Sequence, residues 1–132
     1  MTKVLIAFFL LVFGVSFHRP LGQGAALYDP SKEVLLKGVV KEVKEFSCPV
    51  SEGEMGSHLL LETADGMVQV HLAPGRVMRS QNLRFNPGEQ LVVLGARVGM
   101  KMGSTDLIAR EITRGNESFL FRDRQGKLML TQ

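Results

Sequence analysis

The chain has 132 residues, with 16 basic and 13 acidic side chains, one cysteine and no tryptophan. This length fits a single domain. The basic pI of about 9.3 argues little for nucleic-acid binding, because Lys3 and Arg19 belong to the first 26 residues and the rest of the chain is close to neutral. A lone cysteine excludes an internal disulfide, so the hydrophobic core has to stabilise the fold.

The first 26 residues predict a secretory signal peptide. Lys3 gives a positive start, and an uncharged apolar run of 14 residues follows from Val4 to Phe17. A membrane-spanning helix needs roughly 20 such residues. Cleavage fits after Ala26 or after Ser16, and a retained anchor is the alternative. We expect a periplasmic or secreted barrel domain over residues 27–132, with no membrane span after cleavage and with 14 basic and 13 acidic side chains.

Glu33 to Phe46 predicts one long strand after an exposed lead-in over residues 27–31. Its β-branched content and its interior Gly38 favour a strand over a helix. A glycine inside such a strand marks a bulge or a sharp bend, which would let the strand serve two sides of a barrel. A polar loop from Ser47 to Gly56 follows.

Ser57 to Pro74 predicts a β-hairpin, because two apolar-rich runs flank Asp65-Gly66, a dipeptide typical of two-residue turns. The inward face would be aliphatic apart from one threonine. Counting outward from the turn, its pairs are Thr63 with Val68, Leu61 with Val70, and Leu59 with Leu72.

The second half of the chain predicts a short helix and more strands. The helix covers residues 76–82, and Asn86-Pro87-Gly88-Glu89 has the pattern of a type II turn. Strands are expected over residues 90–98 and 105–113. A closing hairpin is expected over residues 117–130, with its turn at Asp123 to Gly126.

This order of elements is that of an OB-fold. We therefore predict an all-β fold: a five-stranded OB-like Greek-key barrel with a short connector helix and a C-terminal β-hairpin. A small open β-sandwich or meander could be built from the same strands. The short helix between the third and fourth strands favours the barrel.

From about Val34 to Leu130 the chain resembles a group of small exported bacterial proteins with OB-like domains, whose functions are largely uncharacterised. The resemblance rests on the motifs GVVKEV, SHLLLETADGMVQVHLAP, NPGE before LVVLGARV, LIAREI and FRDRQGKL. It implies the fold and export, and it implies no activity.

The pair His58 and His71 is the strongest candidate for chemistry. In the predicted register the two histidines are diagonal neighbours on the outward face of the hairpin, about 7 Å apart. Cys48 or Met55, on the preceding loop, could supply a third ligand. Sulfur together with imidazole suits Cu(I), or Zn where a thiolate dominates. Two ordinary surface histidines are the alternative interpretation.

Met100-Lys101-Met102 is a second candidate for soft metals. It resembles the Met-x-Met pair of one class of periplasmic OB-fold proteins that bind Cu(I) and Ag(I), which implies Cu(I) binding here. That class also uses a His and a Trp, and this chain has no Trp. A loop that contains two methionines is the alternative.

We predict a non-catalytic exported binding module for a small ligand, an oligosaccharide or an envelope protein partner, with a soft-metal carrier as the alternative. OB-folds bind such ligands on the face of their second and third strands. Nucleic acid is not expected as a partner. No set of residues with catalytic spacing is present, so no enzyme is expected. The ligand-binding residues predicted on this face are His58, Leu60, Glu62, Gln69, His71, Arg76 and Arg79.

Overall fold

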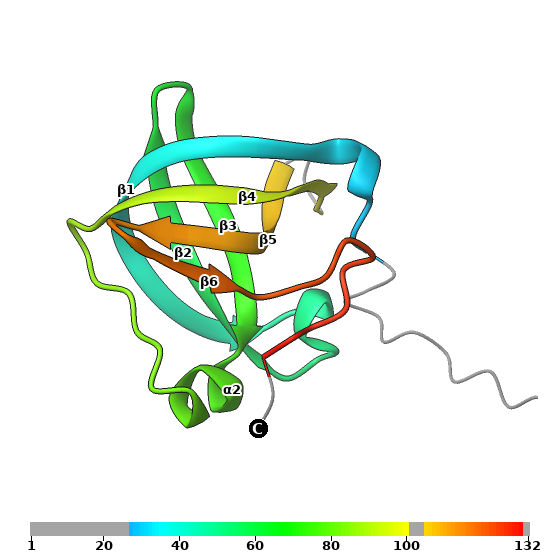
Figure 1. Cartoon of the computed structure of the whole chain (residues 1–132). Coiled ribbons are helices and arrows are strands. Elements are labelled where there is room, and N and C mark those ends of the chain that lie inside the picture. The colour runs from blue at the N-terminus through cyan, green and yellow to red at the C-terminus, as the bar shows by residue number, and fades with distance from the viewer. Residues whose placement is uncertain (1–26, 101–104, 131–132) are drawn as a thin grey trace, which may run out of the picture.

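A computed structural model of the chain describes residues 27–100 and 105–130. The predicted signal peptide over residues 1–26 lies outside the described residues, as do Lys101 and Met102 of the methionine pair. Within the described residues the chain consists mainly of strands. The elements, in order, are η1 (Pro30–Lys32), β1 (Glu33–Ser47), η2 (Pro49–Ser51), β2 (Met55–Thr63), β3 (Gly66–Pro74), α2 (Gly75–Ser80), β4 (Gln90–Gly99), β5 (Thr105–Arg114) and β6 (Glu117–Leu120), where η marks a 3₁₀ turn (Figure 1).

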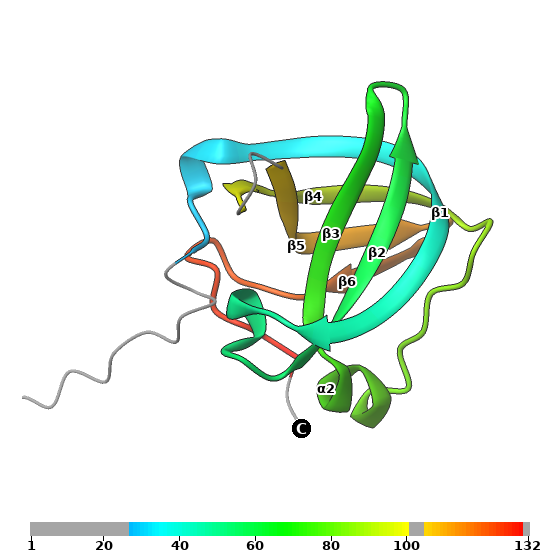
Figure 2. The ribbon, with the colours of Figure 1, turned by 180° about the vertical axis from the view of Figure 1, so that it is seen from behind.

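The strands form one sheet that closes on itself. Their order is β3-β2-β1-β4-β5-β6, and a further parallel pairing of β3 with β5 closes the ring. Seen from behind, β1, β2 and β3 form the near wall, and α2 lies at one end of the barrel between β3 and β4 (Figure 2). Five strands closed in this order, with a helix between the third and fourth, confirm the predicted OB barrel, and the closure excludes the open sandwich or meander.

The long strand β1 bends and pairs on both sides, as predicted. Its first half pairs with β4 and its second half with β2, and Gly38 takes part in both ladders. A Cβ at Gly38 would lie 2.5 Å from the backbone oxygen of Glu62, so only glycine allows this close approach. The bulge itself falls between Val40 and Glu42, slightly beyond the glycine.

The β2–β3 hairpin forms, but its predicted register is wrong by two residues. Thr63 pairs with Gly66, so the turn residues are Ala64 and Asp65. Thr63 Oγ1 accepts a hydrogen bond from the Asp65 N–H, and Gly66 alone takes the left-handed φ, at 118°. The observed inward pairs are Leu61 with Val68 and Leu59 with Val70. A shift of two residues keeps every side chain on its predicted face.

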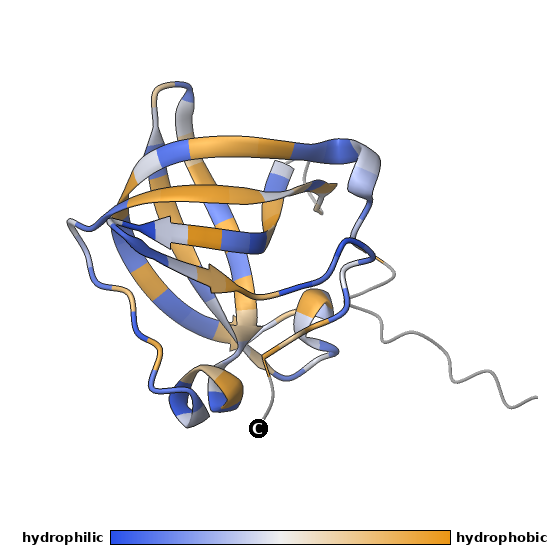
Figure 3. Cartoon of the chain, in the orientation of Figure 1, coloured by the Kyte–Doolittle hydropathy of each residue, from blue (hydrophilic) through white to orange (hydrophobic). Residues whose placement is uncertain are grey.

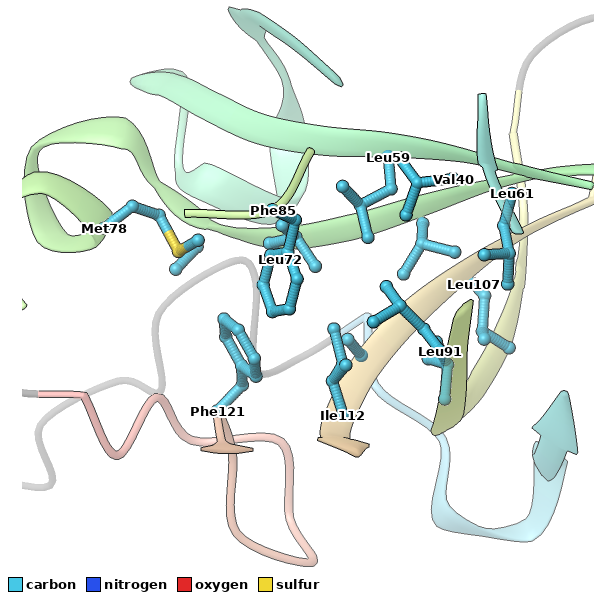
Figure 4. Close-up of a cluster of buried hydrophobic side chains, with 14 of the residues drawn as sticks. Val40, Leu59, Leu61, Leu72, Met78, Phe85, Leu91, Leu107, Ile112 and Phe121 are labelled. Atoms are coloured by element: carbon cyan, nitrogen blue, oxygen red, sulfur yellow. The ribbon is translucent and has the colours of Figure 1, made fainter. Parts of the chain in front are cut away.

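The barrel interior is a continuous apolar core. Apolar and polar residues alternate along the strands (Figure 3), and side chains from β1, β2, β3, β4, β5, α2 and the segment after β6 meet inside (Figure 4). The predicted inward residues Leu59, Leu61, Val70 and Leu72 are all buried. Phe121, after β6, is also fully buried and closes one end of this core.

The predicted closing hairpin over residues 117–130 is short. β6 pairs with β5, and the chain then returns through a single bridge between Arg122 and Leu128. The Asp123 carboxylate accepts hydrogen bonds from the N–H groups of Gln125 and Lys127, which fixes the turn.

We predict that Gly38→Ala destabilises the barrel by about 1–3 kcal/mol, because the added methyl group meets backbone that cannot move aside. Urea unfolding followed by circular dichroism measures the change. Gly99→Ala is the matched control, since a Cβ there meets nothing within 4 Å. Equal midpoints for the two variants would contradict this account of the bend.

Candidate metal centre

Four polar side chains from four parts of the fold meet on the outer side of the β2–β3 hairpin. Cys48 follows β1, His58 lies on β2, His71 on β3, and Asp106 on β5. The observed register sets His58 directly opposite His71. The parallel pairing of His71 with Ile108 then brings the start of β5, with Asp106, beside His71. The fold therefore gathers groups that lie far apart in the sequence.

This cluster is buried, which corrects the expectation that both histidines face solvent. His58 and His71 are each 2% exposed and Cys48 is 6% exposed. The histidines do point away from the barrel interior, but a second apolar layer covers them. We call this layer the outer cluster; its members are Tyr28, Cys48, Val50, Ala96, Val98 and Ile108. The predicted exposed lead-in is also corrected here, because Tyr28 is 5% exposed.

The donor atoms form a short chain of contacts. His58 Nε2 lies 3.2 Å from Cys48 Sγ and 2.9 Å from His71 Nδ1. The three donor atoms of Cys48, His58 and His71 all lie within 4.8 Å of one another. Phe46 stacks on the His58 ring with a centroid distance of 3.7 Å, which fixes the plane of that imidazole.

Asp106 sets the tautomer of His71. Its Oδ2 accepts hydrogen bonds from His71 Nε2 at 2.7 Å and from the side-chain amide of Gln69 at 3.0 Å. A neutral imidazole that donates from Nε2 carries a lone pair on Nδ1, which here points toward His58 and Cys48. A carboxylate behind a histidine in this way is typical of metal sites, where it orients the ring and makes it a better ligand.

Both imidazoles are held in the neutral form. Burial, reinforced by the neighbouring His71, lowers the pKa of His58 to about 4. Burial also lowers the pKa of His71, although the Asp106 carboxylate opposes this effect. Neutral imidazole is the form that binds metals, so at neutral pH no proton has to be removed from a charged ring.

His58 Nδ1 is buried and makes no well-aligned hydrogen bond. This nitrogen is unprotonated when Nε2–H donates to His71. Backbone groups at Gly56 and Lys44 lie where they favour a proton on the ring. A metal ion on Nε2 would move the proton to Nδ1 and would thereby satisfy this atom. The orphaned nitrogen is therefore explained by a bound ion better than by the metal-free network.

Gly56 packs tightly against the loop that carries Cys48. A Cβ at this position would lie 3.2 Å from Cys48 Sγ and would collide with the Ser51 hydroxyl. Gly56 has an ordinary β-strand conformation, so the need for glycine is steric. The close packing of β2 on the Cys48 loop therefore depends on a missing side chain.

A small open pocket gives access from the surface. Its volume is about 110 Å³, and it reaches His58 and Phe46 between the strands of the near wall. The residues that line it are Glu42, Lys44, Phe46, His58, Leu59, Leu60 and Gln69. An ion entering here would meet the His58 ring first.

The two methionines predicted as further ligands lie in different surroundings. Met55 is 52% exposed at the start of β2, whereas the three grouped donors belong to buried residues. Met100 packs against the outer cluster as a partly buried apolar side chain.

Part of the predicted ligand-binding face comes together in the structure, because His58, Leu60 and Gln69 line the same pocket. Besides the buried histidines, Gln69 is bonded to Asp106, Leu60 is half-buried and Glu62 pairs with Lys41. Arg76 and Arg79 form ion pairs with Glu54 and Glu45, at 2.7 Å each.

Aromatic residues in the described part of the chain are engaged in packing. Tyr28, Phe85 and Phe121 are buried. Phe46 stacks on His58, and Phe119 packs edge-on against Phe85. A row of exposed rings for stacking nucleic-acid bases is therefore not found among the described residues.

Sequence reasoning missed Asp106 and Arg122. Both are polar residues in segments read only as strands, and both are buried. An OB-fold pairs its third and fifth strands in parallel, so the topology already placed the start of the last barrel strand beside His71. That signal could have identified Asp106.

Comparison with known proteins gives one family. The family model described as "MamS/MamX magnetosome protein family" matches residues 33–119, which cover all five barrel strands and all four residues of the cluster. No curated protein matches the chain. Within residues 27–100 and 105–130, no helix has the length and apolar character needed to cross a membrane.

We predict that the metal-free protein loses stability as the pH falls from about 6.5 to about 4. A histidine in the unfolded chain has a pKa of about 6.5, whereas that of His58 in the folded chain is about 4. In this window the unfolded state binds more protons, so acid favours unfolding. The stability that neutral His58 contributes is fully present above the pKa of the unfolded chain and is lost as the pH falls to the pKa of the folded chain. Its size is on the order of 2–3 kcal/mol.

Urea unfolding at a series of pH values measures this loss. His58→Gln keeps a polar side chain that can reach the same partners but cannot titrate. Its stability should change less across the window. If the free energy of unfolding fell equally with pH in the wild type and the variant, His58 would not be a buried neutral base.

Proposed function

The chain belongs to the MamS/MamX magnetosome protein family, and on this premise we propose that it is a non-catalytic metal-binding protein. It holds one soft transition-metal ion on Cys48 Sγ, His58 Nε2 and His71 Nδ1. Asp106 orients His71 from behind.

The single observation that carries this proposal is the buried convergence of three donor atoms within 4.8 Å. Metal–nitrogen bonds are about 2.0 Å long and metal–sulfur bonds about 2.3 Å, so donors around one ion lie at separations of this order. One thiolate and two imidazoles suit Cu(I) or Zn. The magnetosome family adds iron to the metals that a test should include.

A thiol next to an imidazole is also the arrangement of cysteine enzymes, but the surroundings argue against catalysis. Cys48 is buried in the outer cluster, and the adjacent pocket is lined by His58 and not by Cys48. Because Cys48 is only 6% exposed, a substrate would have little space to approach its sulfur.

The alternative function is binding of a small ligand, an oligosaccharide or an envelope protein partner on the outer face of β2 and β3. It has less support, because the histidines are buried and Arg76 and Arg79 are engaged with acidic residues. The proposal retains a periplasmic or secreted location, supported by the leader-like sequence of residues 1–26.

We predict that the purified protein takes up one equivalent of Cu(I) or Zn under anaerobic conditions. Cys48→Ser and the double variant His58→Gln with His71→Gln should each lose at least about 90% of tight binding, because two remaining donors hold an ion weakly. Inductively coupled plasma mass spectrometry after desalting measures the uptake, with Fe(II) and Co(II) tested in parallel. Binding should also raise the thermal midpoint of the wild type alone.

Val98→Ala is the matched control. It removes two methyl groups from the outer cluster and leaves all three donors in place. Wild-type uptake by this variant would separate loss of ligands from loss of packing. Uptake that is equal in all variants, or absent from the wild type, would refute a metal centre.

Asp106→Asn should weaken metal binding by about 10–100-fold, because an amide orients His71 less firmly and removes the negative charge behind the ring. Competition with a chromophoric chelator measures the affinity. Asp29→Asn makes the same chemical change at a surface carboxylate that contacts its local neighbours Ser31 and Lys32, and should leave affinity unchanged. If both variants changed the metal affinity by a similar small amount, Asp106 would have no role in the centre.

A further inference from the structure

A buried arginine is hydrogen-bonded to β5, the strand that carries Asp106, and the proposed binding chemistry does not use it. Arg122 is 3% exposed, and its Nη1 donates a hydrogen bond to the backbone oxygen of Ala109 at 2.6 Å. Ala109 follows Ile108, which pairs directly with His71 and belongs to the outer cluster with Cys48. The guanidinium therefore lies against the strand that carries Asp106.

Arg122 interacts electrostatically with the centre. The charge of Arg122 disfavours a proton on His71, and Cys48 favours the charged form of Arg122. Burial acts in the opposite sense and lowers the pKa of Arg122 to about 10, so the side chain still carries its charge at neutral pH.

The charges around the donor atoms can therefore be counted. A Cys48 thiolate and the Asp106 carboxylate are negative, Arg122 is positive, and both histidines are neutral. Tyr28 also stays neutral, because burial and the Glu33 carboxylate raise its pKa. Glu33 is paired with Arg110 at 2.7 Å and adds no net charge. The protein supplies one net negative charge to a buried site.

We infer that the centre is built for a monovalent soft ion, Cu(I), and that Arg122 is the residue that selects it over divalent Zn. This inference rests on the proposed function. One positive charge makes the buried site neutral, whereas a divalent ion leaves an uncompensated charge, which is costly in a medium of low polarity. Thiolate and imidazole also match Cu(I) in softness.

Arg122 acts through charge and binds no metal itself, so it is a specificity-determining residue. Removing its charge would leave two negative charges around the ion. Divalent ions would then gain more than monovalent ones, because the interaction energy scales with the charge of the ion. The ratio of the two affinities reports this effect, whereas a merely structural role would weaken both metals alike.

The experiment compares Cu(I) and Zn affinities by chelator competition in the anaerobic wild type, Arg122→Gln and Arg97→Gln. Glutamine at position 122 can still donate to the Ala109 oxygen. Arg97→Gln makes the same charge change on β4, between two members of the outer cluster, but at an exposed side chain that solvent screens. Circular dichroism confirms that each variant is folded.

We expect Arg122→Gln to lower the Cu(I)-to-Zn affinity ratio by at least about tenfold through tighter Zn binding, and Arg97→Gln to leave it within about threefold. An unchanged ratio in Arg122→Gln, or a wild type that prefers Zn, would overturn this inference and leave the metal centre standing. A wild type that binds neither metal would instead overturn the proposed function.

A second measurement covers the case in which Arg122→Gln does not fold. Ag(I) and Cd(II) are both soft, thiolate-binding ions, and they differ in charge. The wild type should bind Ag(I) tightly enough to displace Zn, and Cd(II) should bind no more tightly than Zn. Tighter binding of Cd(II) than of Ag(I) would overturn the inference that the charge of the site favours monovalent ions.

Discussion

The pairing of His58 with His71 across the β2–β3 hairpin is the constraint on which the centre depends. Their facing nitrogens are 2.9 Å apart because the register sets the two residues directly opposite each other. Asp106 reaches the pair because β5 lies parallel to β3. Cys48 reaches it because the chain turns back after β1. Each of these approaches is a consequence of closing five strands into a barrel.

The barrel was predictable because its signals are local. Alternating apolar residues, the turn residues before β4 and the glycine in β1 each act within a few positions, and they agree with one another. The hairpin register was harder to predict, since Asp65-Gly66 suggests two left-handed turn residues and Thr63 instead bonds to the backbone of the turn. The error was an even number of residues, so the inward and outward faces remained correct.

Burial of the histidines could not be read from the hairpin alone. The side chains that cover them come from the lead-in at Tyr28, the turn at Val50, and strands β4 and β5. An isolated hairpin with one aliphatic face looks like a sheet with one solvated side. Only the assembled fold shows that a second apolar layer converts this side into an interior, where neutral imidazoles and a buried guanidinium can persist.

The two apolar layers have different roles in the fold. The inner core joins all the strands of the closed barrel and supplies its stability, while the outer cluster surrounds polar groups that cost stability when they are buried. OB-folds commonly bind ligands on the outer face of these strands. In this chain the outer cluster covers part of that face, and His58 and His71 are buried beneath it.

Gly56 shows how such a centre can be lost without any change to a ligand. A single methyl group at this position would collide with Ser51 and press on the Cys48 sulfur, so the loop that carries Cys48 would have to move. Relatives that keep the cysteine and both histidines but carry a larger residue here would retain every donor, with the sulfur displaced from the imidazoles. Inheritance of the chemistry in this family therefore has to be judged from a position that contributes no donor atom.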